Sequence, residues 1–347
     1  MITHGPLPST MAAVQLTGTG GPEKLVYRTD IPLPVPQANA VLIKVGAAGL
    51  NRTDVNTRLG WYGEGEEGVG WSGALKFPLI QGADVCGRIV GVGSRRLAHR
   101  LGERVVVQPC LVSLRRKGLD QWLGSERPGG FAGFVAAPAA DVHPIDSALS
   151  DADLASLPCS WGTAANLIHR ARLKAGETVL VTGASGGLGA GVVALARARG
   201  ARPIAIASTG KRAEVEQALG VPTLSHQEDL RTQLGATAVD LVIDAVGGEL
   251  FPRLLEVIRP GGRYATSGAA GGAKVTLDLR KLYLSDLILV GATSQSRAAF
   301  HSMIGHIERG EARPLPVRAF ALSDFHAAQA AFEARARLES VVVIPPR

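Results

Sequence analysis

The stretch VLVTGASGGLGAGVVALARARG, residues 179–200, decides the fold. An apolar, β-branched run ends in a glycine cluster at 183–189, and a segment of helical character follows it. A helix N-terminus offers unpaired N–H groups with partial positive charge, and glycines let a pyrophosphate approach that backbone closely. The stretch therefore predicts a dinucleotide-binding turn between a strand and a helix. The alternative is a tight structural turn that binds nothing.

The segments after residue 150 alternate between strand and helix patterns. Ser150 and Asp151 are candidate caps for a helical segment at 150–173. Expected strands cover 178–183, 203–208, 239–246, 262–268 and 287–294, and further helices are expected to start near Gly187, Lys211, Glu228 and Glu249. Nearly continuous apolar strands separated by helices indicate a buried parallel sheet. Residues 151–295 are therefore predicted to form a doubly wound α/β domain of the Rossmann type.

The rest of the chain has the pattern of an all-β domain. Strand patterns recur at 11–16, 39–50, 86–93, 103–109 and 131–138, with Gly and Pro between them. Helical patterns at 297–310 and 323–337 precede strand patterns at 316–320 and 340–346, and we expect the last strand to return to the β domain. This organisation predicts a β domain at 1–150 that is completed by 296–347, with residues 1–10 as a loose tail.

The end of the second expected α/β strand bears on the choice of dinucleotide. An NAD site usually has a carboxylate there, which accepts from the ribose 2'-hydroxyl. This chain has Ser208, followed closely by Lys211 and Arg212. Each charge-assisted bond to a 2'-phosphate contributes roughly 1.5 to 3 kcal/mol, so two such bonds favour NADP(H) by more than about a hundredfold. The alternative is that both cations belong to a solvated first helical turn.

Composition excludes several other classes of protein. The chain has 347 residues, 46% of them hydrophobic, and no apolar run long enough to span a membrane. Its three cysteines are far apart, which argues against a disulfide framework and fits a reducing cytoplasm. The net charge is +7, with basic clusters at 94–100 and 113–118, but neither has interleaved aromatics. We therefore expect no nucleic acid as the main partner, although the clusters would suit an anionic cofactor or substrate.

Several motifs together resemble the medium-chain dehydrogenase/reductase superfamily and, within it, the zinc-free quinone oxidoreductase branch. The resemblance runs from Met11 to the end of the chain. It is carried by MAAVQLTGTGGPEKL (11–25), AAGLNRTDVNTRLGWY (47–62), GADVCGRIVGVGS (82–94) and GGFAGFVAAP (129–138). It implies a GroES-like β domain, a nicotinamide cleft between two domains, and a homodimer formed edge to edge through the sheet.

The resemblance also implies which residues hold NADP(H). It places Gly186, Gly187, Leu188 and Gly189 at the pyrophosphate, Ser208, Lys211 and Arg212 at the 2'-phosphate, His226 near the adenosine, and Thr163, Ala245, Val246, Ser267, Gly268 and Thr293 around the ribose and nicotinamide. Two positions depart from the pattern. Relatives often have Tyr at the position of His226, and a Gly-Lys pair where this chain has Glu339-Ser340, which weakens the NADPH assignment.

Four residues are catalytic candidates by the same resemblance. The Asn51 amide would bond the nicotinamide ribose or the substrate oxygen, or else only stabilise a turn. Thr53 stands at the hydroxyl-relay position of zinc-containing relatives, and the alternative is a threonine with a packing role only. Asp54 is expected to orient the segment, against Arg58, rather than to act as a base. Tyr62 would be a proton donor or a loop tyrosine with no such role.

The zinc ligands of related alcohol dehydrogenases are mostly absent. The resemblance puts Asn51 where those enzymes have a Cys, and Ala83-Asp84 where they have His-Glu. Cys159 matches the third ligand, but a catalytic zinc needs three protein ligands. We therefore expect no metal, and we interpret Cys159 as a small buried residue near the nicotinamide. The structural zinc lobe is also expected to be missing, since loop 110–128 has a single Cys.

These inferences predict a zinc-independent NADPH-dependent reductase. Its expected substrates are electrophilic small molecules, namely quinones and α,β-unsaturated carbonyl compounds, because conjugation replaces activation by a metal. One alternative is an enoyl-thioester reductase of acyl-CoA type, with Arg115, Arg116 and Lys117 as contacts to an anionic substrate. Another is a non-catalytic NADPH-binding protein of the same fold. The loop at 60–77, with Trp61 and Trp71, is expected to shape the choice of acceptor.

Overall fold

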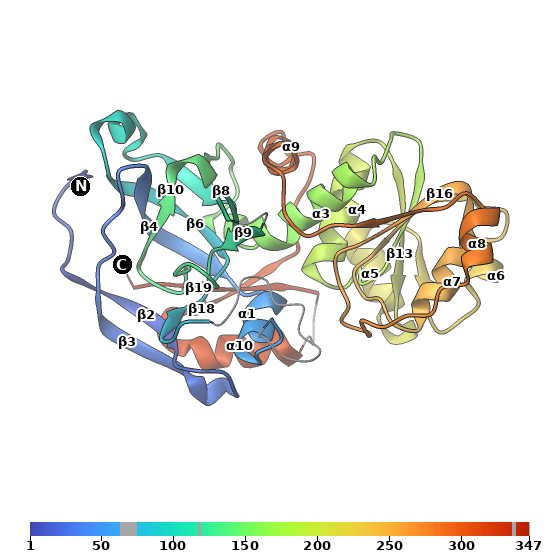
Figure 1. The fold of residues 1–347 in the computed structure, drawn as a ribbon, viewed down its shortest axis with the longest axis horizontal. Coiled ribbons are helices and arrows are strands. Elements are labelled where there is room, and N and C mark those ends of the chain that lie inside the picture. The colour runs from blue at the N-terminus through green and yellow to red at the C-terminus, as the bar shows by residue number, and fades with distance from the viewer. Residues whose placement is uncertain (63–74, 117–118, 335–337, 347) are drawn as a thin grey trace. The chain divides into compact units, whose positions relative to one another are not determined.

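The alternating segments in the second half of the chain form a parallel sheet. The computed structural model describes residues 1–62, 75–116, 119–334 and 338–346, and it separates into two units, Met1–Cys159 with the chain from Pro316 onward, and Ser160–Leu315 (Figure 1). Within the described part of the second unit, the sheet has the strand order β14-β13-β12-β15-β16-β17, and all neighbours are parallel. Its strands are β12 (Thr178–Val181), β13 (Arg202–Ala207), β14 (Thr223–Ser225), β15 (Val239–Asp244), β16 (Ile258–Thr266) and β17 (Ile288–Gly291).

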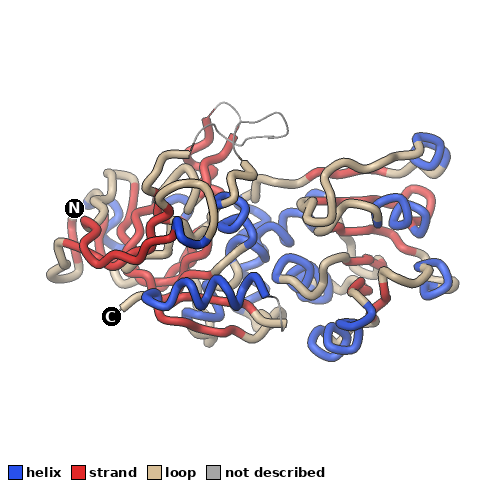
Figure 2. Tube along the Cα trace, turned by 90° about the horizontal axis from the view of Figure 1, so that it is seen from below, coloured by secondary structure: helices blue, strands red, loops and turns tan. Residues whose placement is uncertain are grey.

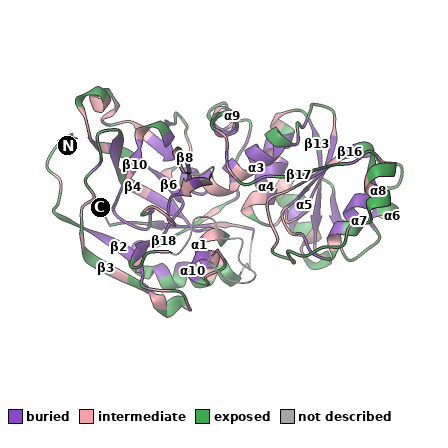
Figure 3. Ribbon diagram, viewed as in Figure 1, coloured by how far each residue is buried: buried purple, intermediate pink, exposed green. Residues whose placement is uncertain are grey.

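Helices cover both faces of this parallel sheet. They are α3 (Pro158–Arg170), α4 (Gly187–Ala198), α5 (Arg212–Leu219), α6 (Leu230–Leu234), α7 (Leu250–Val257), α8 (Leu279–Leu284) and α9 (Arg297–Glu308). Right-handed crossovers put α4 and α5 on one face and, because the strand order reverses after β12, α7 on the other. The core under α6 and α7 includes Leu180, Val242 and Leu254. Figure 3 shows buried central strands and exposed surfaces on α6 and α8.

The first unit is built mainly from antiparallel strands around a separate core, and its strands β18 and β19 pair in parallel. Its largest sheet in the described chain has the order β11-β7-β6-β4-β19-β18, with β1 beside β6 and β10 beside β4. These strands are β1 (Ile2–Thr3), β4 (Ala40–Gly49), β6 (Asp84–Val92), β7 (Arg104–Val107), β10 (Phe134–Pro138), β11 (Val142–Pro144), β18 (Val317–Ala321) and β19 (Ser340–Ile344). Smaller sheets contain β2 (Thr10–Leu16), β3 (Leu25–Pro32) and β5 (Leu79–Ile80), and β8 (Cys110–Arg116) with β9 (Leu119–Trp122).

Three α-helices of the described first unit flank these sheets. Helix α1 (Arg52–Arg58) follows β4 directly, and α2 (Asp151–Ala155) begins at the cap Ser150, whose Oγ accepts from the Asp153 N–H at 3.1 Å. Helix α10 (Phe325–Ala334) packs against β18 and β19, and Figure 2 shows it close to the C-terminus. Ser150 is therefore confirmed as a cap, and the helical segment that we expected at 150–173 is two helices, because Pro158 starts a new one.

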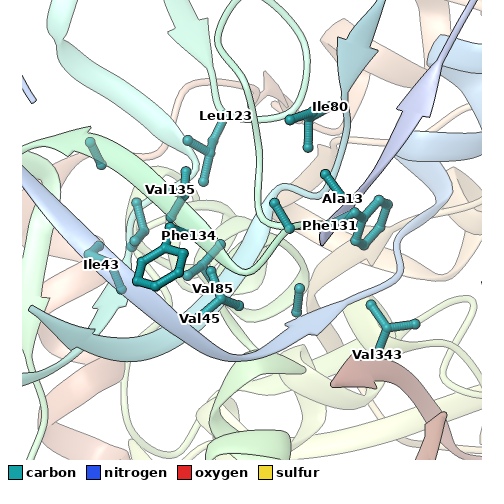
Figure 4. Close-up of a cluster of buried hydrophobic side chains, with 14 of the residues drawn as sticks. Ala13, Ile43, Val45, Ile80, Val85, Leu123, Phe131, Phe134, Val135 and Val343 are labelled. Carbon is teal, nitrogen blue, oxygen red and sulfur yellow. The ribbon is translucent and has the colours of Figure 1, made fainter. Parts of the chain in front are cut away.

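The core of the first unit joins strands that are far apart in the sequence. Ile43, Val85 and Phe134 come from β4, β6 and β10, and Val343 comes from the end of the chain (Figure 4). The Phe131 ring is fully buried and meets the Phe325 ring of α10 edge to face, with centroids 4.7 Å apart. Burial of these side chains therefore ties the C-terminal segment to the N-terminal sheets.

The structure differs from the sequence prediction in its domain boundaries, its N-terminal tail and several of its strands. The chain leaves the second unit at Pro316 rather than at 296, because α9 buries Phe300 and Met303 against that unit and Arg199 donates to Ser302 Oγ at 2.9 Å. It enters that unit after Cys159 rather than 150. The N-terminal tail is not wholly loose, because β1 pairs with β6. The strands without an expected counterpart are β1, β3, β5, β8, β9, β11 and β14.

No helix among the described residues is both long enough and apolar enough to cross a bilayer.

We predict that Phe131→Ala lowers the free energy of unfolding of the first unit by about 3 to 5 kcal/mol. The substitution removes a fully buried ring and leaves the Phe325 ring without its edge contact. Urea unfolding measures the change. Val35→Ala, at a side chain 74% exposed, is the control and should shift the midpoint little; equal effects of the two substitutions would contradict this account of the core.

Candidate cofactor and active site

The glycine cluster forms the turn from β12 into α4. Gly183 has a φ of +63°, which favours glycine, and Gly186 precedes the first helical residue, Gly187. A Cβ on Gly189 would lie 2.4 Å from the Gly183 carbonyl oxygen, so this glycine lets helix and strand approach. A Cβ on Gly186 would meet nothing closer than 3.5 Å, so protein packing does not require glycine there. Gly186 is exposed at the N-terminus of α4, a place that suits a pyrophosphate.

A buried carboxylate holds the next turn, after β15. Asp244 is fully buried, and its Oδ1 accepts from Thr182 Oγ1 at 2.5 Å and from the Val246 N–H at 2.9 Å. Its Oδ2 accepts from the Tyr264 hydroxyl at 2.5 Å and from the Gly247 N–H at 3.1 Å. The side chain thus joins the ends of β12, β15 and β16. Sequence reasoning did not select Asp244; the only signal was an acidic residue at the end of an apolar strand.

The loop after β16 packs on the turn that Asp244 holds. The Gly271 N–H donates to the Val246 carbonyl at 2.7 Å, and the Gly248 N–H donates to the Gly272 carbonyl at 3.0 Å. A Cβ on Gly268 would lie 2.4 Å from the Ala245 carbonyl oxygen. The predicted residues Ala245, Val246, Ser267 and Gly268 are therefore brought together at the carboxyl end of the sheet. This is the edge at which doubly wound sheets bind ligands.

Thr163 and the segment of Thr293 also meet within the second unit. Thr163 lies on α3, and its Oγ1 accepts from the buried Gln295 side chain at 3.3 Å, two residues beyond Thr293. A hydrogen bond therefore links α3 to the segment after β17.

The predicted 2'-phosphate residues cluster at the ends of β13 and β14. Ser208 precedes the short helix that contains Lys211, and α5 begins at Arg212. The His226 N–H donates to the Ala207 carbonyl at 3.1 Å, which places His226 beside the end of β13. Arg212 Nη1 lies 3.9 Å from Glu228 Oε2, and both side chains are exposed. Exposed pairs at this distance contribute little, so Arg212 is available to an anion.

In the first unit, Asn51 is held by two carboxylates. It precedes α1, and its backbone N–H donates to Asp54 Oδ2 at 2.8 Å. Its side-chain Nδ2 donates to Asp84 Oδ2 at 2.7 Å, and Asp84 Oδ1 accepts from the Cys159 N–H at 2.5 Å. The three positions at which the resemblance compared zinc ligands therefore lie together. Sequence reasoning named Asp84 in that comparison but did not select it as a site residue.

Burial governs the ionisation of this cluster. It raises the pKa of Asp54 to about 7 and that of Asp84 to about 8, although N–H donors oppose the shift in both. Burial also raises the pKa of Cys159 well above its usual value, and the charges of Asp84, Asp54 and Cys110 add to the shift. The Cys159 thiol is therefore neutral around pH 7, which disfavours it as a metal ligand or nucleophile.

A small pocket adjoins the cluster in the first unit. Thr53, Asp54 and Tyr62, all predicted, line it. Further lining residues come from the end of β9 and the turn after it, and sequence reasoning missed them: Trp122, Leu123, Gly124 and Ser125. Asn56 Nδ2 lies 3.4 Å from the Tyr62 hydroxyl. The pocket therefore has hydroxyl groups, from Thr53, Tyr62 and Ser125, and the indole ring of Trp122 among its lining side chains.

Two expected contacts of the site region are different in the structure. Arg58 does not pair with Asp54; it donates to Glu333 Oε1 at 2.8 Å and to the Gly20 carbonyl at 2.7 Å, and so joins α1 to α10. Arg115 pairs with Asp120 at 2.7 Å. Of the loop at 60–77 that we expected to shape the choice of acceptor, residues 63–74, with Trp71, lie outside the described residues, as do residues 117–118 of the basic cluster.

Possible metal ligands are not grouped in the part of the chain that the structure describes. No set of three or more His, Cys, Asp or Glu side chains there is arranged to hold a metal ion. The acidic residues Glu64, Glu66 and Glu67 lie outside the described residues.

Comparisons with known proteins match both units. The family model for the alcohol dehydrogenase GroES-like domain matches residues 37–147, and the model named zinc-binding dehydrogenase matches residues 187–309. A quinone oxidoreductase of Mus musculus is 29% identical over 310 residues, which are 86% of each chain. An NAD-dependent alcohol dehydrogenase of Sulfurisphaera tokodaii is 27% identical, over 90% of this chain and 94% of the relative.

A solved structure agrees over almost the whole chain. It is that of a protein from Sinorhizobium meliloti 1021, provisionally named an alcohol dehydrogenase, which is 43% identical, covers 98% of both chains and superposes with a TM-score of 0.89. The oxidoreductase relatives, the two family models and the Rossmann strand order lead to one assignment. The chain belongs to the medium-chain dehydrogenase/reductase superfamily, a family of nicotinamide-dependent oxidoreductases.

Proposed function

We propose that this oxidoreductase is a zinc-independent, NADPH-dependent reductase of quinones or α,β-unsaturated carbonyl compounds. The observation that carries the proposal is the hydrogen-bonded cluster of Asn51, Asp84 and Cys159. A carboxamide is a poor zinc ligand, both Asp84 oxygens already accept N–H groups, and the Cys159 thiol is held neutral. A site with these side chains favours substrates that conjugation has already activated.

The residues of the second unit supply the cofactor site in this proposal. The turn at Gly186–Gly189 holds the pyrophosphate, and the turns at 245–248 and 267–272 border the ribose and nicotinamide. When bound, the cofactor supplies a hydride to an electron-poor carbon of the substrate. The oxygen at the other end of the conjugated system then needs a proton, and the hydroxyl groups of Thr53 and Tyr62 line the pocket that would supply it.

The preference for NADPH rests on charge at the end of β13. Ser208 stands where a carboxylate would repel a 2'-phosphate, and Lys211 and Arg212 follow it. The Sulfurisphaera relative is named NAD-dependent, so the preference separates this chain from that protein and is open to direct measurement.

An acceptor panel tests the reaction. Purified protein with NADPH should reduce 1,4-quinones or 2-alkenals, and turnover should survive removal of zinc by a chelator. Faster turnover of crotonyl-CoA would favour the enoyl-thioester alternative. Tight NADPH binding without turnover of any acceptor would favour a non-catalytic role, and about one zinc per active chain would refute the metal-free site.

We predict that neutralising Lys211 and Arg212 together, with alanine at both, weakens NADPH binding by about a hundredfold or more and leaves NADH binding nearly unchanged. The two cations act only on the extra phosphate. Calorimetric titration with each dinucleotide measures both affinities. Lys174→Ala removes an exposed cation elsewhere in the second unit and serves as the control. Equal weakening of NADH and NADPH would sink the assignment.

We also propose that a second copy of the chain covers the edge of the parallel sheet at β17. Within the described chain β17 pairs only with β16, which leaves its other edge open. Apolar side chains gather on β17 and the neighbouring α8: Leu279, Tyr283, Leu284 and Ile288 are 64%, 63%, 71% and 54% exposed. An open edge strand beside an apolar patch is a template for strand pairing between copies.

The prediction for this surface is that Ile288→Lys converts a dimer into monomers, because a charge on the edge strand opposes pairing. Light scattering after size exclusion gives the mass of each variant. Val35→Lys, at another exposed apolar position, should leave the mass unchanged. A wild-type chain that is monomeric at micromolar concentration would refute the dimer.

The proposed compartment is the cytoplasm. Cys86, Cys110 and Cys159 are not joined by disulfide bonds, which supports a reducing environment.

A further inference from the structure

The carboxylate of Asp84 has no role in the proposed reaction so far, although it is almost fully buried beside a catalytic candidate. We infer that Asp84 is a positioning residue, which fixes the Asn51 carboxamide in one orientation for the reaction. This inference rests on the proposed function of the site, because it assigns Asp84 a part in substrate reduction through Asn51.

The first argument is the chemistry of the contact. Above its pKa of about 8, Asp84 is an ionised carboxylate that only accepts hydrogen bonds, whereas a carboxamide has a donor end and an acceptor end of nearly the same shape. With Asp84 opposite, the Asn51 Nδ2 must face the carboxylate, as the 2.7 Å contact shows. The second Nδ2 hydrogen then has a defined direction. Without Asp84 the broad terminal torsion of asparagine leaves both orientations accessible.

The second argument is that Asp84 is itself held rigidly. Asp84 on β6 pairs with Gly49 on β4, and Gly49 lies two residues before Asn51 in the sequence. A Cβ on Gly49 would lie 3.1 Å from the Asp84 Cβ and 2.3 Å from the Ala155 carbonyl, so the two strands and α2 are in close contact. The other oxygen of Asp84 is occupied by the Cys159 N–H. The carboxylate therefore offers Asn51 a fixed acceptor.

The third argument is that Asn51 is anchored at its backbone as well. Its N–H donates to Asp54 Oδ2, and Asp54 also accepts from the Gly82 N–H at 3.3 Å and lines the pocket with Thr53 and Tyr62. The Asn51 side chain also accepts from the Asp54 backbone N–H in the capping box of α1. Asp84 binds the opposite, Nδ2 end, so the carboxamide is held in one orientation from both ends.

The kinetic test is a double-mutant cycle between Asp84→Asn and Asn51→Ala. An amide at 84 has one acceptor oxygen for two donors, so either Asn51 or Cys159 loses its partner. We expect Asp84→Asn to lower kcat about tenfold to a hundredfold with little change in KM. In the Asn51→Ala background, the same substitution should have almost no further effect. A loss of kcat that is equally large in both backgrounds would overturn the inference.

Two comparisons separate positioning from general damage to the fold. Asp84→Glu keeps a carboxylate and should recover part of the lost kcat. Asp141→Asn removes a different buried carboxylate of the same unit, one that accepts from Ser113, and should leave kcat unchanged. Asp141→Asn should also leave NADPH affinity unchanged, since the residues proposed to hold the phosphates of the cofactor lie in the second unit.

A spectroscopic test does not require turnover, so it remains decisive if the proposed reaction fails. The chain has four asparagines, at 39, 51, 56 and 166, so selective ¹⁵N labelling gives few side-chain signals. At pH 9, above the pKa of about 8 that burial gives Asp84, one Nδ2–H of Asn51 should be shifted downfield and protected from exchange. Asp84→Asn should abolish that difference and Asp141→Asn should not. An Asn51 signal that Asp84→Asn leaves unaltered would refute the contact itself.

Discussion

A carboxylate that is buried away from water needs hydrogen-bond donors around it, and each unit has one such carboxylate at its candidate site. In the second unit, Asp244 is satisfied by donors on β12 and β16 and by the turn that follows β15. In the first unit, Asp84 is satisfied by Asn51 and by the backbone at Cys159. Each carboxylate therefore joins segments that are distant in the sequence. Each also lies beside residues that we propose to bind the cofactor or the substrate.

The strands and helices that bury their own apolar side chains could be predicted from sequence. The alternation after residue 150 predicted the parallel sheet, and the glycine cluster predicted the turn into α4, because both signals are local. Strand β14 has only three residues, too few for a periodic signal, and β1 is defined by its pairing with β6. We predicted that the chain returns to the first unit at 296, which is too early, because the packing of α9 against the second unit depends on tertiary contacts. The sequence of that helix is compatible with either unit.

The site was predictable to the extent that its residues lie within short motifs. Asn51, Thr53 and Asp54 come from one segment and do lie at one place, whereas Trp122 and Ser125 reach the pocket only through the fold of β8 and β9. Asp244 was missed because an acidic residue at a strand end is common, and only its four donor groups reveal its importance. For Arg58, nearness in the sequence was misleading. Its nearness to Asp54 in sequence suggested a pair, but from α1 its side chain reaches Glu333 on α10.

The glycines at the β12–α4 turn are needed for different reasons, some for protein packing and one, as we propose, for a ligand. Gly189 is needed by the protein itself, because a side chain there would strike the Gly183 carbonyl. Gly183 is needed for its positive φ. Neither reason applies to Gly186, where a side chain would meet ordinary contacts and whose backbone conformation is open to any residue. The feature that remains at Gly186 is exposed backbone at the N-terminus of a twelve-residue helix. A bulky side chain at that point would cover those N–H groups, which supports our proposal that the pyrophosphate of the cofactor binds there.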